Sequence, residues 1–258
     1  MAEFRVRHFG GPLVYSSPAQ AGPFEGLPLH VVAQIGADGL GGTQFYFNHF
    51  KQWEGPVAEG SAAGWTLSGT TGAATIALSD VRIGEIALTA DATANCNPTL
   101  QLGSATVGMN FTYSVGKKLW VGARMKLTVV ATAELFFGLG TADTSPTVTG
   151  TLPSDGLFYH KTLTGTKVNF DARKDGTSTS RTLIGTTLLD ATYTILTFYV
   201  DPTGNVHLFQ DGVELIASMI AAGTANLPAV TDLMQFEMGI LGASQVLTLD
   251  WLLAAQEI

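Results

Sequence analysis

Short apolar runs with a period of two begin near Gly42 and continue to the end of the chain. Gly, Asp, Asn and Pro separate the runs, a pattern typical of half-buried β-strands joined by tight turns. The predicted strands are Trp65–Leu67, Thr75–Leu78, Glu85–Thr89, Thr99–Leu102, Leu119–Val130, Glu134–Leu139, Gly156–Lys161, Lys167–Arg173, Thr182–Thr186, Tyr193–Val200, Val206–Gln210, Val213–Ile216, Leu233–Leu241 and Val246–Ala254. Nearly every residue from Tyr193 to Val200 is β-branched or aromatic, so we expect this strand to be covered on both faces.

The residues between the runs are those that tight turns require. Asp201–Asn205 separates two apolar runs, with proline and glycine placed for a reversal. Asp211 and Gly212 form a strong hairpin signal, because both positions tolerate a positive φ. Only Leu215–Ala222 is weakly helical. Many short strands with almost no helix predict an all-β fold: a two-sheet antiparallel β-sandwich, or jelly roll.

Residues 1–41 differ from the rest and predict an extended, Pro/Gly-rich N-terminal arm, followed by a sandwich domain over residues 42–258. Four prolines exclude a helix or a central strand there, although a short β-ladder could form at Phe4–Phe9. The arm is too apolar to float free in water, so we expect it to lie along its own domain or to clasp a neighbour. A disordered tail is the alternative. The residues expected to make arm contacts are Phe4, Val6, Phe9, Leu13, Tyr15, Phe24 and Leu27.

The charge balance excludes several partners. Charged residues are 13% of the chain, the net charge is −8, and only 13 residues are Lys or Arg. No basic stripe is present, which excludes nucleic acid, and no apolar run is long enough for a membrane-spanning helix. Cys96 is the single cysteine, so we interpret it as a small buried hydrophobe rather than a disulfide or zinc residue. The first residues lack the apolar core of a secretory signal, which predicts synthesis in the cytoplasm.

Two segments of the C-terminal half carry a family resemblance. Thr197–Gly212 has the form y.D..G.v.ly.DG, and Leu247–Leu253 places an acidic residue before an aromatic one. Both segments resemble the concanavalin A-like lectin/glucanase jelly rolls, and the resemblance covers about Leu119–Ile258. It implies the sandwich fold and relatives that act on or bind polysaccharides. The overall layout also resembles virion proteins of tailed bacteriophages: a proline-rich arm, a weakly charged Gly/Thr/Ala-rich sandwich and no disulfide.

The catalytic motifs of those relatives are missing from the sequence. Retaining glucanases of the fold carry Glu-x-Asp-x-Glu on one strand, so that alternate side chains share a face, and lyases carry Gln-x-His. Neither motif occurs here. Glu85, Glu134 and Glu237 each stand in an apolar run without a second carboxylate two residues away. We interpret Glu134 as a solvated strand residue or an ion-pair partner, and we predict no catalytic residues and no cofactor.

Metal and phosphate sites have only weak candidates. Asp91, Asn95 and Asn97 lie on one loop, where calcium ligation is one interpretation and turn formation the favoured one. The five histidines show no ligand spacing. The glycine-rich stretch 36–42 lacks the Lys-Ser/Thr of a phosphate loop and is better interpreted as a hinge between arm and sandwich.

A ligand-binding face is the remaining candidate for chemistry. Period two places Trp120, Arg124 and Lys126 on one face of their strand, and His160 and Arg173, with Asn169 and Asp171, could share that polar face. An aromatic ring beside polar groups suits a sugar, which stacks on the ring while the polar groups fix its hydroxyls. The alternative is that this is merely the outward face of a sheet.

These observations give a leading hypothesis: a non-enzymatic structural protein of a bacteriophage virion, such as a capsid decoration or stabilising protein. Its partners would be other copies of itself and a major capsid or other virion protein, with no nucleic acid and no membrane. The alternative is a carbohydrate-binding or receptor-binding virion module, and a weaker option is a polysaccharide-degrading enzyme.

Overall fold

The computed structural model describes residues 43–48, 50, 55–62, 64–69, 72–80, 84–102, 110–141 and 152–257. The predicted arm, including Phe4–Phe9 and the arm contact residues, lies outside the described residues. In the described part, strands form two sheets and the only helical turns are two short 3₁₀ segments, Val130–Thr132 and Ile216–Ser218. No helix in the described residues has the length and apolar character to cross a membrane.

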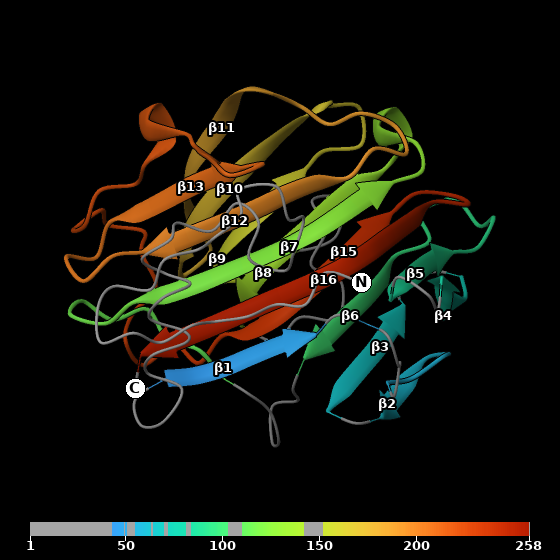
Figure 1. The fold of residues 1–258 in the computed structure, drawn as a ribbon, viewed down its shortest axis with the longest axis horizontal. Helices are drawn as coiled ribbons and strands as arrows, with labels where there is room; N and C mark the ends of the chain where they lie inside the picture. The colour runs from blue at the N-terminus through green and yellow to red at the C-terminus, as the bar shows by residue number, and fades with distance from the viewer. Residues whose placement is uncertain are drawn as a thin grey trace, which may run out of the picture.

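Sheet A faces the viewer in Figure 1 and has the strand order β14-β13-β12-β7-β16-β5-β4, with β1 paired to the far end of β16. Its central strands are β7, β12 and β16, and every pairing in it is antiparallel. The bounds of its strands are β1 Thr43–Asn48, β4 Ala74–Asp80, β5 Glu85–Ala90, β7 Leu119–Leu127, β12 Thr194–Val200, β13 Val206–Gln210, β14 Val213–Glu214 and β16 Val246–Glu257.

Sheet B lies behind sheet A and has the order β11-β10-β9-β8-β15-β6-β3-β2, again with antiparallel pairing throughout. Its strands are β2 Gly60–Ala62, β3 Trp65–Gly69, β6 Pro98–Leu102, β8 Glu134–Gly140, β9 Gly156–Lys161, β10 Lys167–Lys174, β11 Thr177–Thr187 and β15 Gln235–Leu241. The two packed antiparallel sheets confirm the predicted β-sandwich.

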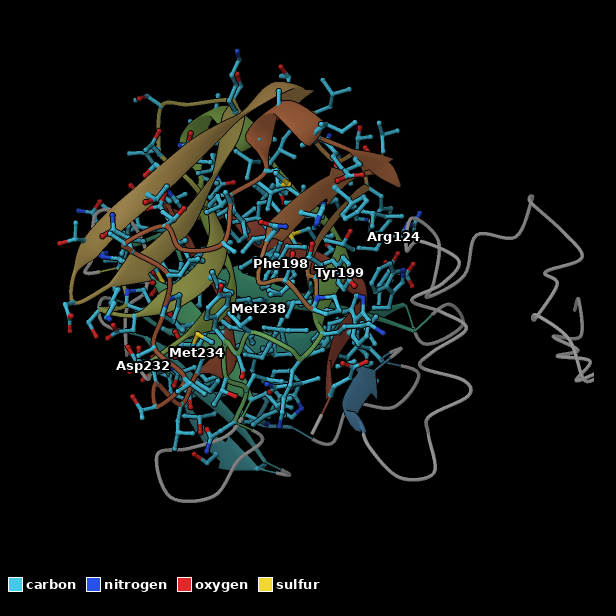
Figure 2. The ribbon with its side chains drawn as sticks, turned by 90° about the vertical axis from the view of Figure 1, so that its left-hand side faces the viewer. Arg124, Phe198, Tyr199, Asp232, Met234 and Met238 are labelled. Atoms are coloured by element: carbon cyan, nitrogen blue, oxygen red, sulfur yellow. The ribbon has the colours of Figure 1, made fainter. Side chains whose placement is uncertain are left out.

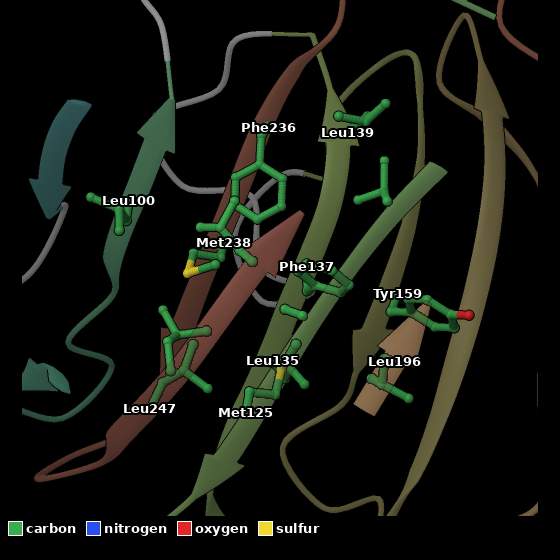
Figure 3. Close-up of a cluster of buried hydrophobic side chains, with 14 of the residues drawn as sticks. Leu100, Met125, Leu135, Phe137, Leu139, Tyr159, Leu196, Phe236, Met238 and Leu247 are labelled. Carbon is green, nitrogen blue, oxygen red and sulfur yellow. The ribbon is translucent and has the colours of Figure 1, made fainter. Parts of the chain in front are cut away.

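The core lies between the sheets, where leucine and methionine side chains pack around Phe137, Tyr159 and Phe236 (Figure 3). Phe137 and Tyr159 of sheet B stack at 6.0 Å, and Phe170 meets Phe198 of sheet A at 5.2 Å between ring centroids. The Tyr159 hydroxyl donates a hydrogen bond to the carbonyl of Thr197 in β12. Burial raises the pKa of Tyr159, so the phenol remains neutral and acts only as a donor between the two sheets.

The local predictions hold at most strands. All seven residues of β12 are buried, which confirms a strand covered on both faces. Asp211 and Gly212 have φ of 48° and 79°, the double positive φ of the predicted hairpin turn. The strand expected over Leu119–Val130 ends earlier, at Leu127, because the chain turns and the backbone N–H of Val130 donates to the Asp190 carboxylate at 2.6 Å.

Candidate functional site

The predicted ligand face is divided between the two sheets. Trp120, Arg124 and Lys126 lie on β7 in sheet A, whereas His160 and Arg173 lie on β9 and β10 in sheet B. In each strand these residues alternate with core residues, so each group points away from the core on its own side of the sandwich. The prediction that the five residues share one face is therefore wrong, because a period of two does not say which sheet a strand joins.

The outer face of sheet A is apolar along its centre. We define it by the outward residues of β12, β13, β7 and β16. Two clusters separate from the main core lie there: Trp120, Tyr199, Phe209 and Ala255, and Ile195, Trp251 and Leu253. Trp120 stacks on Tyr199 at 5.4 Å with the planes 11° apart, and it is only 1% exposed. Its ring is therefore an interior contact and is not presented to a sugar.

Arg124 and Lys126 belong to a charge cluster at one end of that face. Both cations lie over the ring of Tyr193, at 4.0 Å for Arg124 and 4.3 Å for Lys126. Arg124 pairs with Asp250, Lys126 pairs with Glu85 at 3.9 Å, and the Tyr193 hydroxyl donates to Glu85. Burial, with help from Glu85, raises the pKa of Tyr193. The charges of Arg124 and Lys126 are thus balanced by those of Asp250 and Glu85 around the neutral phenol of Tyr193. The charged groups of the cluster pair with one another and need no ligand.

The outer face of sheet B is polar and is organised in rows across the strands. One row follows the register Asp171–Phe158–Gly138–Glu237–Gln101 over five neighbouring strands. These polar side chains are buried although they point away from the core: Asp171 is 3% exposed, Glu237 is fully buried and Gln101 is 7% exposed. Phe158 in the middle of the row is fully buried as well.

Two side-chain amides hold the Glu237 carboxylate. Its Oε1 accepts hydrogen bonds from Nε2 of Gln101 at 3.1 Å and from Nε2 of Gln235 at 2.7 Å. The neighbouring position on β8, Gly138, leaves no room for a side chain. A Cβ at Gly138 would lie 2.5 Å from the carbonyl oxygen of Leu157, and the φ of Gly138 is +153°. Alternation within β15, which places Gln235 and Glu237 on the face opposite Phe236 and Met238, is the sequence signal for this cluster.

His160 and Asp171 form the second polar group of this face. His160 Nε2 lies 3.2 Å from Asp171 Oδ1. Burial alone would raise the pKa of Asp171, but hydrogen bonds from His160 and from the hydroxyls of Ser180 and Ser178 lower it below its ordinary value. The sequence placed His160, Asp171 and Arg173 on one face, and that part of the prediction agrees with the register. The partner residues on β11 were not expected.

Comparison with known proteins identifies the fold but no family. No protein-family model matches the sequence, and neither does any curated protein. The carbohydrate recognition domain of Emp46p, in its potassium-bound form, gives a TM-score of 0.51 at 12% identity, over 74% of this chain and 88% of its own. The β-glucanase of Bacillus licheniformis gives 0.52 at 15% identity, over 83% of this chain and 98% of its own.

This chain has the lectin–glucanase fold. A protein of unknown function from Shewanella oneidensis MR-1, SO2946, shares it with a TM-score of 0.55 and 14% identity, over 94% of this chain and 97% of that one. The neighbours include both lectins and enzymes. The structural similarity therefore shows the jelly-roll architecture, and the activity has to be inferred from the residues of this chain.

On the outer face of sheet B, the carboxylates of Glu134, Glu237 and Asp171 lie too far apart to act as a glycosidase pair. The outward positions of β8 are Glu134, Phe136 and Gly138, so this strand offers one carboxylate. Glu134 and Glu237 stand four residues apart along paired strands, about 14 Å at ~3.4 Å per residue. Glu237 and Asp171 stand three strands apart, again about 14 Å at ~4.8 Å per strand. Two-carboxylate glycosidases need roughly 5–9.5 Å between the two groups.

Glu134 also differs from expectation in its environment. It is 2% exposed, so the interpretation as a solvated residue is wrong. The alternative interpretation, an ion-pair partner, fits better because Glu134 interacts electrostatically with buried Lys161. Burial lowers the pKa of Lys161 to about 8, and the charge of Glu134 acts in the opposite direction. Lys161 Nζ also donates to the carbonyls of Ala133 and Thr162.

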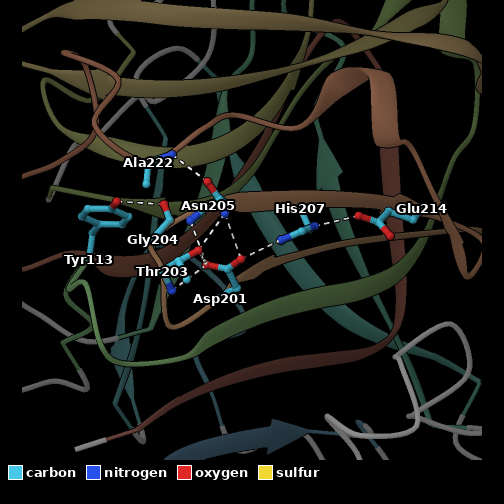
Figure 4. A network of polar contacts seen from close by, with 8 residues as sticks. All are labelled: Tyr113, Asp201, Thr203, Gly204, Asn205, His207, Glu214 and Ala222. Carbon is cyan, nitrogen blue, oxygen red and sulfur yellow. Dashed lines mark hydrogen bonds and ion pairs between the residues drawn. The ribbon is translucent and has the colours of Figure 1, made fainter.

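The strand–turn–strand that carried the family resemblance is built around Asp201 (Figure 4). Asp201 accepts hydrogen bonds from the backbone N–H groups of Thr203 at 2.8 Å and Asn205 at 2.9 Å, and it lies 3.1 Å from His207 Nε2. His207 Nδ1 is 2.7 Å from Glu214. Burial would lower the pKa of His207, but the two flanking carboxylates raise it. The acidic residue of this pattern therefore shapes the turn.

The loop considered for calcium is also explained by turn formation. The Asp91 carboxylate accepts hydrogen bonds from the backbone N–H groups of Ala73 and Thr93, both at 2.7 Å, and these bonds lower its pKa. Asn95 has a positive φ of 62°, and Asn97 is buried. No group of three metal-binding side chains occurs in the described part of the chain. Cys96 is buried in the main core, as its interpretation required.

Proposed function

We propose that this chain is a non-enzymatic structural protein of a bacteriophage particle, which contributes a rigid sandwich and binds neighbouring subunits. The observation that carries the proposal is that both sheets have buried side chains at the centres of their outward faces. Trp120 and Trp251 are each 1% exposed on sheet A, and Phe158 is fully buried on sheet B. A sugar-binding platform needs an accessible aromatic ring, and none of these three rings is accessible.

The composition and the surface support the same proposal. Few charges and a net charge of −8 suit a surface that other subunits cover. Two pairs of large apolar side chains remain exposed: Val213 and Ile216 are 65% and 74% exposed, and Val230 and Leu233 are 61% and 59% exposed. Such pairs are suitable contact points for a second copy of the chain or for a major capsid protein.

The test is the location of the protein. Particles are purified on a density gradient from a culture that encodes the chain and are labelled with antibody raised against the recombinant protein. The proposal expects label on intact particles and a fixed copy number by quantitative mass spectrometry. Protein recovered only in the soluble fraction, or turnover on a panel of polysaccharides, would contradict it.

A second candidate is a carbohydrate-binding protein, favoured by the polar groups of the row on sheet B. Its carboxylates and amides, in Asp171, Glu237 and Gln101, are groups that bind sugar hydroxyls. Glycan-array binding that is lost in Asp171→Asn would favour this function. Arg124→Gln, on the opposite side of the sandwich, is the matched control and should bind like the natural chain.

A further inference from the structure

The outer face of sheet A is apolar and buried, and no described strand lies over it. Its two apolar clusters contain seven side chains, all 9% exposed or less. Figure 1 looks onto this face: β12, β7 and β16 are in front, and no described strand crosses them. In the view turned by 90°, Tyr199 lies on this side of the sandwich, opposite β10 and β11 of sheet B (Figure 2). If it were left uncovered, an apolar face of this size would be unfavourable in water.

We propose that the N-terminal arm of the same chain, residues 1–41, is the cover. The first argument is where the arm ends. β1 begins at Thr43, which pairs with Glu257 at the end of β16, and Phe45 pairs with Ala255 of the Trp120 cluster. The chain that precedes Thr43 therefore joins the sandwich at the border of the apolar face. Residues 1–42 are the longest stretch of chain outside the described residues.

The second argument is length and composition. The seven-strand path of sheet A is about 30 Å wide at ~4.8 Å per strand, and about ten extended residues span that distance at ~3.3–3.6 Å each. The arm can cross the face more than once. Its apolar residues can pack on the clusters, and its prolines lack the N–H groups that an extended cover would otherwise leave unpaired.

The third argument is an unused donor on the face. Trp120 Nε1 is buried and has no acceptor within the described part of the chain, and Thr197 Oγ1 on the neighbouring strand is buried without a partner as well. An extended segment carries backbone carbonyls that can accept from such groups. An arm lying across β7 and β12 supplies carbonyls where these two atoms need them.

The experiment compares the full chain with a variant that lacks residues 1–40. Trp120 and Trp251 lie on the face in question, whereas Trp65 lies in the core between the sheets and reports whether the sandwich folds. Truncation should shift the emission to longer wavelength and raise acrylamide quenching severalfold, and the Trp120→Phe/Trp251→Phe background should abolish both changes. Light scattering should give the same oligomeric state for the full chain and the truncated chain.

A second variant guards against misfolding of the truncated chain. In the full-length protein, Leu13, Tyr15, Phe24 and Leu27 are changed together to Ser, with Val57→Ser, which is already 66% exposed, as the matched control. The arm variant should show the same increase in quenching, and the control should not. Unchanged emission in both arm variants would overturn the proposal. A full chain that is oligomeric and becomes monomeric on truncation would also overturn it, since the cover would then come from another copy.

Discussion

The centres of the two outward faces of this sandwich are both buried, but by different chemistry. On sheet A, Trp120, Tyr199 and Trp251 form apolar clusters whose stability depends on excluding water. On sheet B, Glu237 and Asp171 are buried with hydrogen-bonding partners on neighbouring strands. The difference teaches that burial on an outward face has two requirements: an apolar face needs a cover, and a polar face needs partners of its own.

The largest expected effect is on the apolar face. Trp120→Ala should lower the free energy of unfolding by about 3–5 kcal/mol, as for a core residue, because the ring is buried against Tyr199. Urea unfolding followed by circular dichroism measures this. Val57→Ala, at an exposed site, is the control and should stay within ~0.5 kcal/mol. A loss for Trp120→Ala as small as that of the control would mean that the face is open to water.

A smaller effect is expected on the polar face. Glu237→Ala should cost roughly 1–3 kcal/mol, because the buried amides of Gln101 and Gln235 lose their shared acceptor. A second variant changes Gln101, Gln235 and Glu237 together to Leu, which removes the donors and the acceptor at once. It should recover most of the stability that Glu237→Ala loses. If the triple variant is less stable than Glu237→Ala, the three side chains stabilise the fold through contacts other than the hydrogen bonds among themselves.

The smallest effect is expected at the corner of sheet A, where His207 lies between Asp201 and Glu214. Its folded-state pKa is raised, so its contribution to stability is fully present below the unfolded pKa of about 6.5 and is lost as the pH rises through the folded pKa. His207→Gln should therefore cost up to ~1 kcal/mol at pH 5.5 and less at pH 8.5. Equal costs at the two pH values would show that the charge of His207 does not contribute.

The sequence predicted the fold well because its signals are local. Period-two runs gave the strands, and Asp211-Gly212 gave the hairpin that the positive φ values confirm. The face of a candidate site was predicted only within a sheet. His160 and Asp171 come together because neighbouring strands share a register. Trp120 was grouped with residues of the other sheet, because the sheet that a strand joins depends on long-range pairing. The burial of Glu134 could not be predicted either, since it depends on what lies over the strand.

The central claim is that the apolar outward face of sheet A is an interior surface. Hydroxyl-radical footprinting of the full chain, read by peptide mass spectrometry, tests it residue by residue. We predict that Trp120 and Trp251 are oxidised as slowly as Trp65, which lies between the sheets. Oxidation of Trp120 and Trp251 at the rate of exposed tryptophan, with Trp65 still protected, would contradict the account.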